Sequence, residues 1–126
     1  MLDVLIIALA GSCGALMRYA LIQLLASVVC IIPIATLLVN VTGCLMAGLL
    51  ISFPCCGLIT IQVRTWLLVG LLGAYTTMSS FILETEQLFA SGGALYAVSN
   101  IFLTFGGCLL AFFVGKSVGM AFFARF

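Results

Sequence analysis

The sequence has no histidine, only two prolines and few charges: four Lys or Arg and three Asp or Glu among 126 residues. So few charges cannot cover a water-facing surface, which excludes an ordinary soluble domain. The basic residues are scattered along the chain, which excludes a nucleic-acid-binding surface. Because there is also no acid pair in a cleft-like setting, no nucleophile beside a base and no phosphate-binding glycine loop, nothing supports an enzyme.

Long apolar runs dominate what is present, since 66% of the residues are hydrophobic. A bilayer core about 30 Å thick needs about 20 apolar residues per helix. Barrel strands would instead alternate over ten-residue segments. The first run has no basic residues ahead of it, so we interpret it as a retained helix and not a signal peptide. We predict one all-α transmembrane domain, residues 1–126, with both termini on one side and spans at 2–25, 31–53, 64–90 and 95–122.

The few basic residues say little about orientation in the membrane. Arg64, Lys116 and Arg125 fall toward the terminal side, whereas Arg18 falls nearer the other end of the first span. Because positive charge normally marks the cytoplasmic side, so weak a bias permits insertion in both orientations. We therefore hypothesise an antiparallel homodimer.

Six cysteines are present, but none forms a CxxC pair and no histidine accompanies them. Neither a disulfide framework nor a metal site has its usual spacing. We interpret most of them as small packing residues and the vicinal pair in the "PCCG" loop as labelling sites. The six are Cys13, Cys30, Cys44, Cys55, Cys56 and Cys108.

Small residues recur every three or four positions in the second and fourth spans, which predicts close helix packing in lipid. These residues are Thr36, Asn40, Gly43 and Ala47, and Gly107, Ala111, Gly115 and Gly119. Asn40 stands apart, because a buried amide without partners costs a few kcal/mol, about 1–3 by mutational measures. Asn40 must therefore face protein or a water-filled cavity. Two roles remain equally open: it joins two helices by hydrogen bonds, or it lines a pore.

The stretch "GAYTTMSSF", residues 73–81, places a Gly, two Thr and two Ser inside the third span. These residues have low helix propensity, and their hydroxyls compete for backbone hydrogen bonds. We predict a helix broken near its middle, which a membrane tolerates only where the break is buried in protein or lines a cavity. The alternative is an intact helix whose hydroxyls bond back to the preceding turn.

Three segments then match a known family in order and spacing: "GSCGALMRY" at 11–19, "TLLVNVTGCLMAG" at 36–48 and "GLLGAYTTMSSF" at 70–81. They resemble the small fluoride channels called CrcB or Fluc. The resemblance implies an antiparallel homodimer with two pores in a microbial inner (plasma) membrane. It would release fluoride passively, select against chloride and protect the cell from fluoride. A structural sodium ion would be held at the dimer centre by the backbone carbonyls of Gly73 and Thr76.

The resemblance also assigns residues to the fluoride path. It implies a pore-facing Asn40, two path positions at Met78 and Phe81, a fourth-span polar track at Asn100 and Thr104, and vestibule charges at Arg18 and Glu84. The alternative for Asn100 and Thr104 is that they only hold two helices together by packing. The alternative for Arg18 is that its side chain extends to the membrane interface.

Physical chemistry makes these roles reasonable, because a fluoride pore must replace tightly held water with close donors. The Asn40 amide and the hydroxyls of Thr77, Ser79 and Ser80 are such donors. Phe81 can turn its electropositive ring edge toward an anion. Met78 departs from the family's phenylalanine, and its flexible thioether removes one ring edge. Either the channel tolerates this change or conduction is altered.

Two other functions stay open. A small multidrug-type proton-coupled exporter would also have four short helices, but it needs an acid embedded in its first helix, where this chain has only Asp3 and Arg18. A non-transporting assembly subunit would explain the glycines but neither the broken helix nor Asn40.

Overall fold

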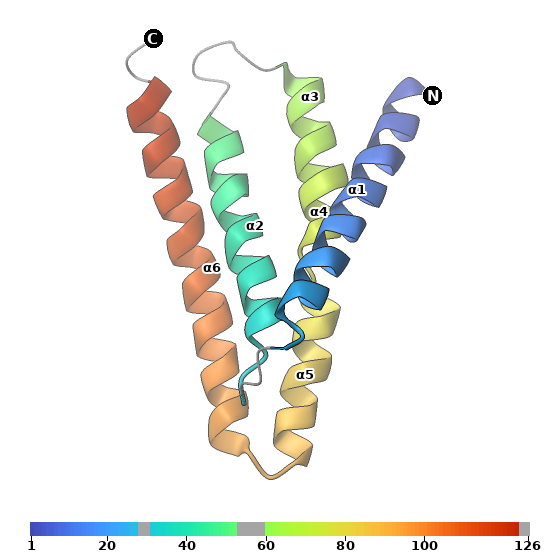
Figure 1. Ribbon diagram of the computed structural model, residues 1–126. Coiled ribbons are helices and arrows are strands. Elements are labelled where there is room, and N and C mark those ends of the chain that lie inside the picture. Colours follow the sequence, from blue (N-terminus) through green and yellow to red (C-terminus); the bar gives the residue numbers. More distant parts are fainter. Residues whose placement is uncertain (28–30, 53–59, 124–126) are drawn as a thin grey trace.

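The computed structural model describes residues 1–27, 31–52 and 60–123 (Figure 1). Within these residues, four helices are long and apolar enough to cross a membrane, as the sequence predicts. The interpretations of Cys30, Cys55, Cys56 and Arg125 lie outside the described residues. The spans are α1 (Leu2–Leu25), α2 (Ile34–Ser52), a third span from Ile61 to Ala90, and α6 (Ala94–Phe123).

The third span consists of four segments. Its successive parts are α3 (Ile61–Thr65), the π-helical η2 (Trp66–Leu72), α4 (Gly73–Tyr75) and α5 (Met78–Ala90). It begins at Ile61 and not at 64 because Thr60 caps it: the Thr60 hydroxyl accepts a hydrogen bond from the Val63 amide at 3.3 Å.

The spans form two packed pairs that diverge toward one end of the molecule (Figure 1). α2 runs along α6, and α1 runs along η2 and α4. The start of α1 and the end of α6 lie at that same end, which confirms the prediction for the termini. At the opposite end α5 turns into α6 through Gly92, whose φ of 79° favours glycine.

Glycines set the close approach of α2 and α6. A Cβ added to Gly115 would lie 2.2 Å from the Leu45 carbonyl oxygen, and one added to Gly48 would lie 2.1 Å from that of Phe112. The small-residue packing predicted for the fourth span is therefore confirmed at Gly115. On α2 the contact with α6 runs through Gly48, whereas Gly43 packs against Thr76 of the third span.

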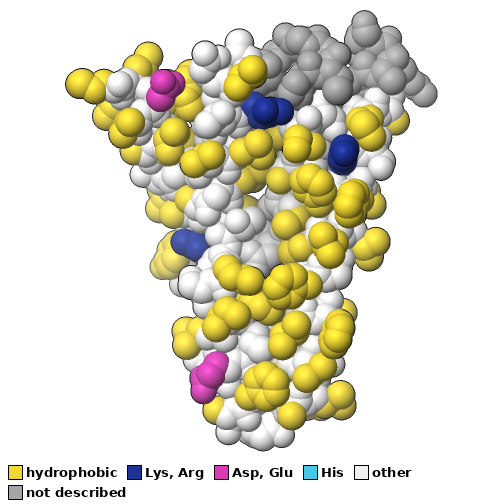
Figure 2. Space-filling view, turned by 180° about the vertical axis from the view of Figure 1, so that it is seen from behind, with side chains coloured by type: hydrophobic (Ala, Val, Ile, Leu, Met, Phe, Trp, Pro, Cys, Tyr) yellow, Lys and Arg dark blue, Asp and Glu magenta, His cyan; other side chains and the backbone are white. Residues whose placement is uncertain are grey.

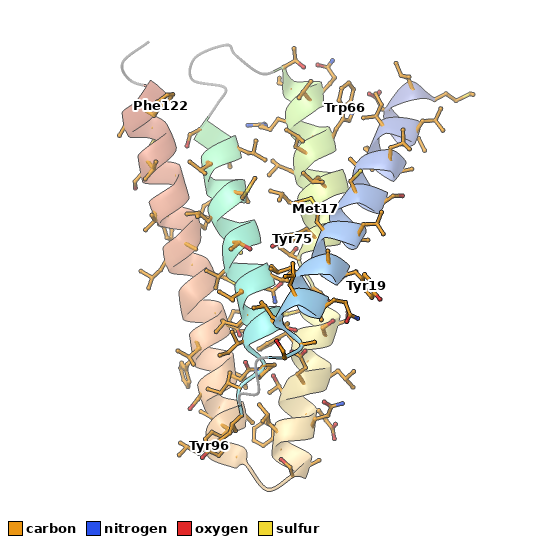
Figure 3. All side chains as sticks on the ribbon, viewed as in Figure 1. Met17, Tyr19, Trp66, Tyr75, Tyr96 and Phe122 are labelled. Atoms are coloured by element: carbon orange, nitrogen blue, oxygen red, sulfur yellow. The ribbon has the colours of Figure 1, made fainter. Side chains whose placement is uncertain are left out.

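The distribution of side chains is that of a lipid-facing protein. Large hydrophobic side chains cover the surface seen in Figure 2, with few charges among them. One amphipathic aromatic residue lies near each end: Figure 3 places Trp66 near the start of α1 and Tyr96 at the α5–α6 turn. The Trp66 indole donates to the Asp3 carboxylate at 2.9 Å. Amphipathic rings at both ends are typical of membrane interfaces, so this is a multi-pass membrane protein.

Candidate functional site: a helix break and the cavity beside it

The third span is interrupted at Thr76 and Thr77. Their backbone angles are extended, with φ/ψ of −74°/153° and −144°/112°. The predicted break is therefore confirmed, and an intact helix is excluded. It is narrower than 73–81, because Gly73–Tyr75 is already helical and α5 starts at Met78. η2, just before it, is a π-helix, a form that occurs frequently at functional sites.

Asn40 holds this break in place with two hydrogen bonds to one residue. Its Nδ2 donates to the Thr77 carbonyl at 3.1 Å, and the Thr77 amide donates to its Oδ1 at 2.8 Å. Both residues are buried, at 7% and 4% exposure. Asn40 thus connects α2 to the break. Its amide has a second N–H that these bonds do not use.

The break releases two backbone carbonyls from helical hydrogen bonds. In an unbroken α-helix the Gly73 carbonyl would accept from the Thr77 amide, and the Thr76 carbonyl from the Ser80 amide. Here the Thr77 amide donates to Asn40, and the Ser80 amide donates to the Thr77 hydroxyl at 3.2 Å. The two carbonyls are therefore free of these helical donors. Unwound carbonyls of this kind bind sodium in membrane transporters.

A cavity of about 200 Å³ lies beside the break, and we name it the break cavity. Its lining comes from α2, the break, the first residue of α5, and α6, and consists of Asn40, Cys44, Thr76, Thr77, Met78, Thr104, Phe105 and Cys108. The Thr104 hydroxyl is buried and has no hydrogen-bond partner within the described part of the chain. Because an unpaired buried hydroxyl is costly, Thr104 is a candidate partner for a polar guest at this cavity.

Hydroxyl groups also cluster on the first turn of α5. The Thr77 hydroxyl is 3.2 Å from the Ser79 hydroxyl and donates to the Ser80 hydroxyl at 3.0 Å. Ser79 is exposed and Ser80 half-buried, and neither lines the break cavity.

Phe81 and Asn100 lie behind the cavity wall. Phe81 is only 2% exposed, and its ring meets that of Phe105 edge to face, with centroids 5.7 Å apart. Asn100 donates to the Thr85 hydroxyl at 2.9 Å, which in turn donates to the Phe81 carbonyl at 2.7 Å. Asn100 therefore joins α6 to α5 and does not line the break cavity.

The two predicted vestibule residues are not brought together. Glu84 accepts a hydrogen bond from the Thr36 hydroxyl at 2.6 Å, and its other oxygen is buried without a partner among the described residues. It lines a second cavity of about 200 Å³ with Ile31, Pro33, Gln87 and Leu88. Arg18 is half-buried on α1, and no ion pair between described residues joins it to Glu84.

Sequence reasoning missed several residues around the break. Phe105 and Cys44 line the cavity, and the Tyr75 hydroxyl lies 2.9 Å from the Thr42 hydroxyl near the middle of the molecule (Figure 3). The signal for Cys44 was its position one turn after Asn40, which puts both on one face of α2.

Four apolar spans with a cavity at an interrupted helix define an integral membrane protein that handles a small solute. Residues 5–116 match the family described as CrcB-like protein, Camphor Resistance (CrcB), so the chain belongs to the CrcB family.

Curated relatives carry a more specific name, "Fluoride-specific ion channel FluC". The protein from Desulforapulum autotrophicum is 40% identical over 120 residues, covering 89% of this chain and 94% of its own length. The one from Shewanella putrefaciens is 36% identical, covering 94% and 96%, and the one from Shewanella woodyi is 35% identical, covering 92% and 94%.

Proposed function

We propose that the chain is a fluoride-specific ion channel that releases fluoride passively across a microbial inner (plasma) membrane and so protects against its toxicity. The observation that carries this proposal is the broken third span, pinned by Asn40 beside a cavity that holds an unpaired hydroxyl. The relatives' printed name, at up to 40% identity over most of the chain, supports the choice of ion.

The break cavity offers what a small, strongly hydrated anion needs. The second N–H of Asn40 and the hydroxyl of Thr104 are donors on its wall. Phe105 adds an aromatic ring, whose edge is electropositive. Met78 brings only a thioether, so the path has one aromatic ring edge fewer than it would have with the family's phenylalanine at this position. We assign the path to the predicted set Asn40, Thr77, Met78, Ser79, Ser80, Phe81, Asn100 and Thr104, with Arg18 and Glu84 at its vestibules.

A second copy of the chain would complete the site. Non-helical backbone at membrane depth is tolerated only where protein or a water-filled cavity covers it, yet the residues Gly73, Met78 and Ser79, which flank the break, are exposed in one chain. The weak charge bias, with Arg64 and Lys116 opposed by Arg18, supports an antiparallel partner. The freed carbonyls of Gly73 and Thr76 from both copies would hold the structural sodium ion.

The sequence alternatives fit less well. Asp3 lies in the first turn of α1 and binds the Trp66 indole, so it is not a proton-carrying acid embedded in the membrane. The relatives are named as ion channels, which supports a channel and neither an exporter nor an enzyme. An assembly subunit would leave the cavity and its unpaired hydroxyl without a role.

Fluoride efflux from liposomes containing the purified protein tests the proposal, with chloride as the control ion. Fluoride release without chloride release is the expected result. Release of both ions would reject the proposal. It would also be rejected if neither the folded wild-type protein nor the folded Met78→Phe variant released either ion. The Met78→Phe variant is included because it distinguishes two reasons for a lack of efflux: Met78 blocks the path, or the protein is not a fluoride channel.

A further inference from the structure

We propose that Cys44 and Cys108 form a binding site for a soft divalent metal ion, with Hg²⁺ as the test ion. Cys44 is on α2 and Cys108 is on α6, and both line the break cavity. Both are free cysteines. The pair is therefore two sulfur atoms facing one space between two helices.

The packing of α2 on α6 fixes this pair. Gly107, next to Cys108, approaches the Val41 side chain so closely that an added Cβ would lie 3.1 Å from it. Two turns further on, Gly115 sits against the Leu45 backbone, next to Cys44. Because close contacts at glycines lie on both sides of the two cysteines, the helices cannot easily separate them.

The ligand set selects the class of metal. No group of three or more His, Cys, Asp or Glu occurs among the described residues, so the four ligands of a usual zinc site are missing. Thiolate and thioether sulfur prefer soft ions. Met78 lines the same cavity and adds a thioether as a third sulfur atom.

Charge also favours a divalent ion. Two S–H bonds break, two metal–sulfur bonds form and two protons leave to water, so the metal with two thiolates carries no net charge. A neutral complex avoids the large cost of a charge inside a membrane protein. If the break cavity carries fluoride, which rests on the proposed function, the bound metal would obstruct it beside Asn40.

Metal binding is measured on detergent-solubilised protein, independently of transport. In the full chain Cys13, Cys30, Cys55 and Cys56 are replaced by Ser, and the protein is titrated with HgCl₂. We expect one Hg²⁺ per chain, two protons released and no thiol left for a thiol reagent. Two Hg²⁺ per chain, one on each cysteine, would overturn the proposal. A single Hg²⁺ that leaves one thiol reactive would overturn it as well.

Single variants in the same background supply the matched controls. A competing monothiol should remove Hg²⁺ from Cys44→Ser and from Cys108→Ser. The monothiol concentration needed should be at least about tenfold lower than for the protein that retains both cysteines. Met78→Leu should weaken retention less than either cysteine variant. Equal retention by the pair and the single variants would contradict a shared site. If the four-serine background does not fold, the double variant Cys44→Ser/Cys108→Ser in the natural sequence should lower monothiol-resistant Hg²⁺ by one per chain.

Fluoride efflux then gives a separate readout. Hg²⁺ should block efflux through the chain that retains both cysteines, and Cys44→Ser should relieve the block. A metal that binds with the expected stoichiometry but leaves fluoride efflux unchanged would place the fluoride path outside the break cavity and leave the metal site standing.

Discussion

Replacing Asn40 by Leu tests the central feature of the site, the pinned break. Leu keeps the branched shape of the side chain but removes both hydrogen bonds to Thr77. The Thr77 amide then has no other acceptor within the described residues. The Thr77 carbonyl loses one donor, but as the cap residue of α5 it still accepts the first hydrogen bond of that helix.

The expected loss of stability in Asn40→Leu follows from these two changes at Thr77. A buried amide left without a partner costs about 1–3 kcal/mol, and a lost hydrogen bond costs about 0.5–1.5 kcal/mol. We therefore expect Asn40→Leu to destabilise the protein by about 2–4 kcal/mol. Asn100→Leu is the matched control, because Asn100 is equally buried, at 1% exposure, but donates only to Thr85. The Thr85 hydroxyl keeps its own bond to Phe81, so this variant should cost only about 0.5–1.5 kcal/mol.

Unfolding of both variants in detergent can be followed through Trp66, the single tryptophan. Fluoride efflux is measured on the same preparations, where Asn40→Leu should release fluoride far more slowly than the wild-type protein; Asn100→Leu is the control for stability alone. The reasoning fails if Asn40→Leu is no less stable than Asn100→Leu, or if it keeps the wild-type rate of efflux.

Three further predictions concern the cavity, the packing and the cation. Thr104→Val removes the unpaired hydroxyl and should slow fluoride efflux at least about tenfold without loss of stability, whereas Thr65→Val on the exposed side of α3 should change neither. Gly48→Ala should cost about 1–3 kcal/mol because its Cβ would meet the Phe112 backbone, whereas Gly106→Ala, with open space around it, should be neutral in the same unfolding assay. Exchanging sodium for N-methylglucamine should lower the Tm of the wild-type protein but not that of Asn40→Leu; an equal drop in both would contradict a site that needs the Gly73 carbonyl freed by Asn40.

The sequence predicted the spans well because lipid imposes one strong rule, about 20 apolar residues per crossing. It also located the break, because Thr76 and Thr77 with the following serines favour non-helical backbone. It did not predict the π-helical segment at Trp66–Leu72. That segment is uniformly apolar, and nothing in its composition distinguishes it from an α-helix.

Tertiary pairings were harder to predict, because a repeat of three or four residues shows which side chains share a face but not what the face contacts. Asn40 and Gly43 were placed on one face of α2, and both do contact the third span. Gly48, which packs on α6, was missed because Ala47 fitted the spacing better. Cys44 and Cys108 were interpreted as separate packing residues, since their neighbourhood depends on how α2 and α6 are aligned.

The hydrogen bonds at the break couple the proposed anion path to the proposed cation site through one side chain. Asn40 accepts the Thr77 amide that would otherwise return to the Gly73 carbonyl, so the same bond that exposes this carbonyl also fixes the amide on the wall of the break cavity. Without Asn40, the Thr77 amide regains an acceptor only if the helix closes over the break. Closure would remove the Gly73 carbonyl from any sodium ion and displace the cavity wall together. Loss of fluoride efflux and loss of the sodium effect should therefore appear in the same variant, Asn40→Leu, and not separately.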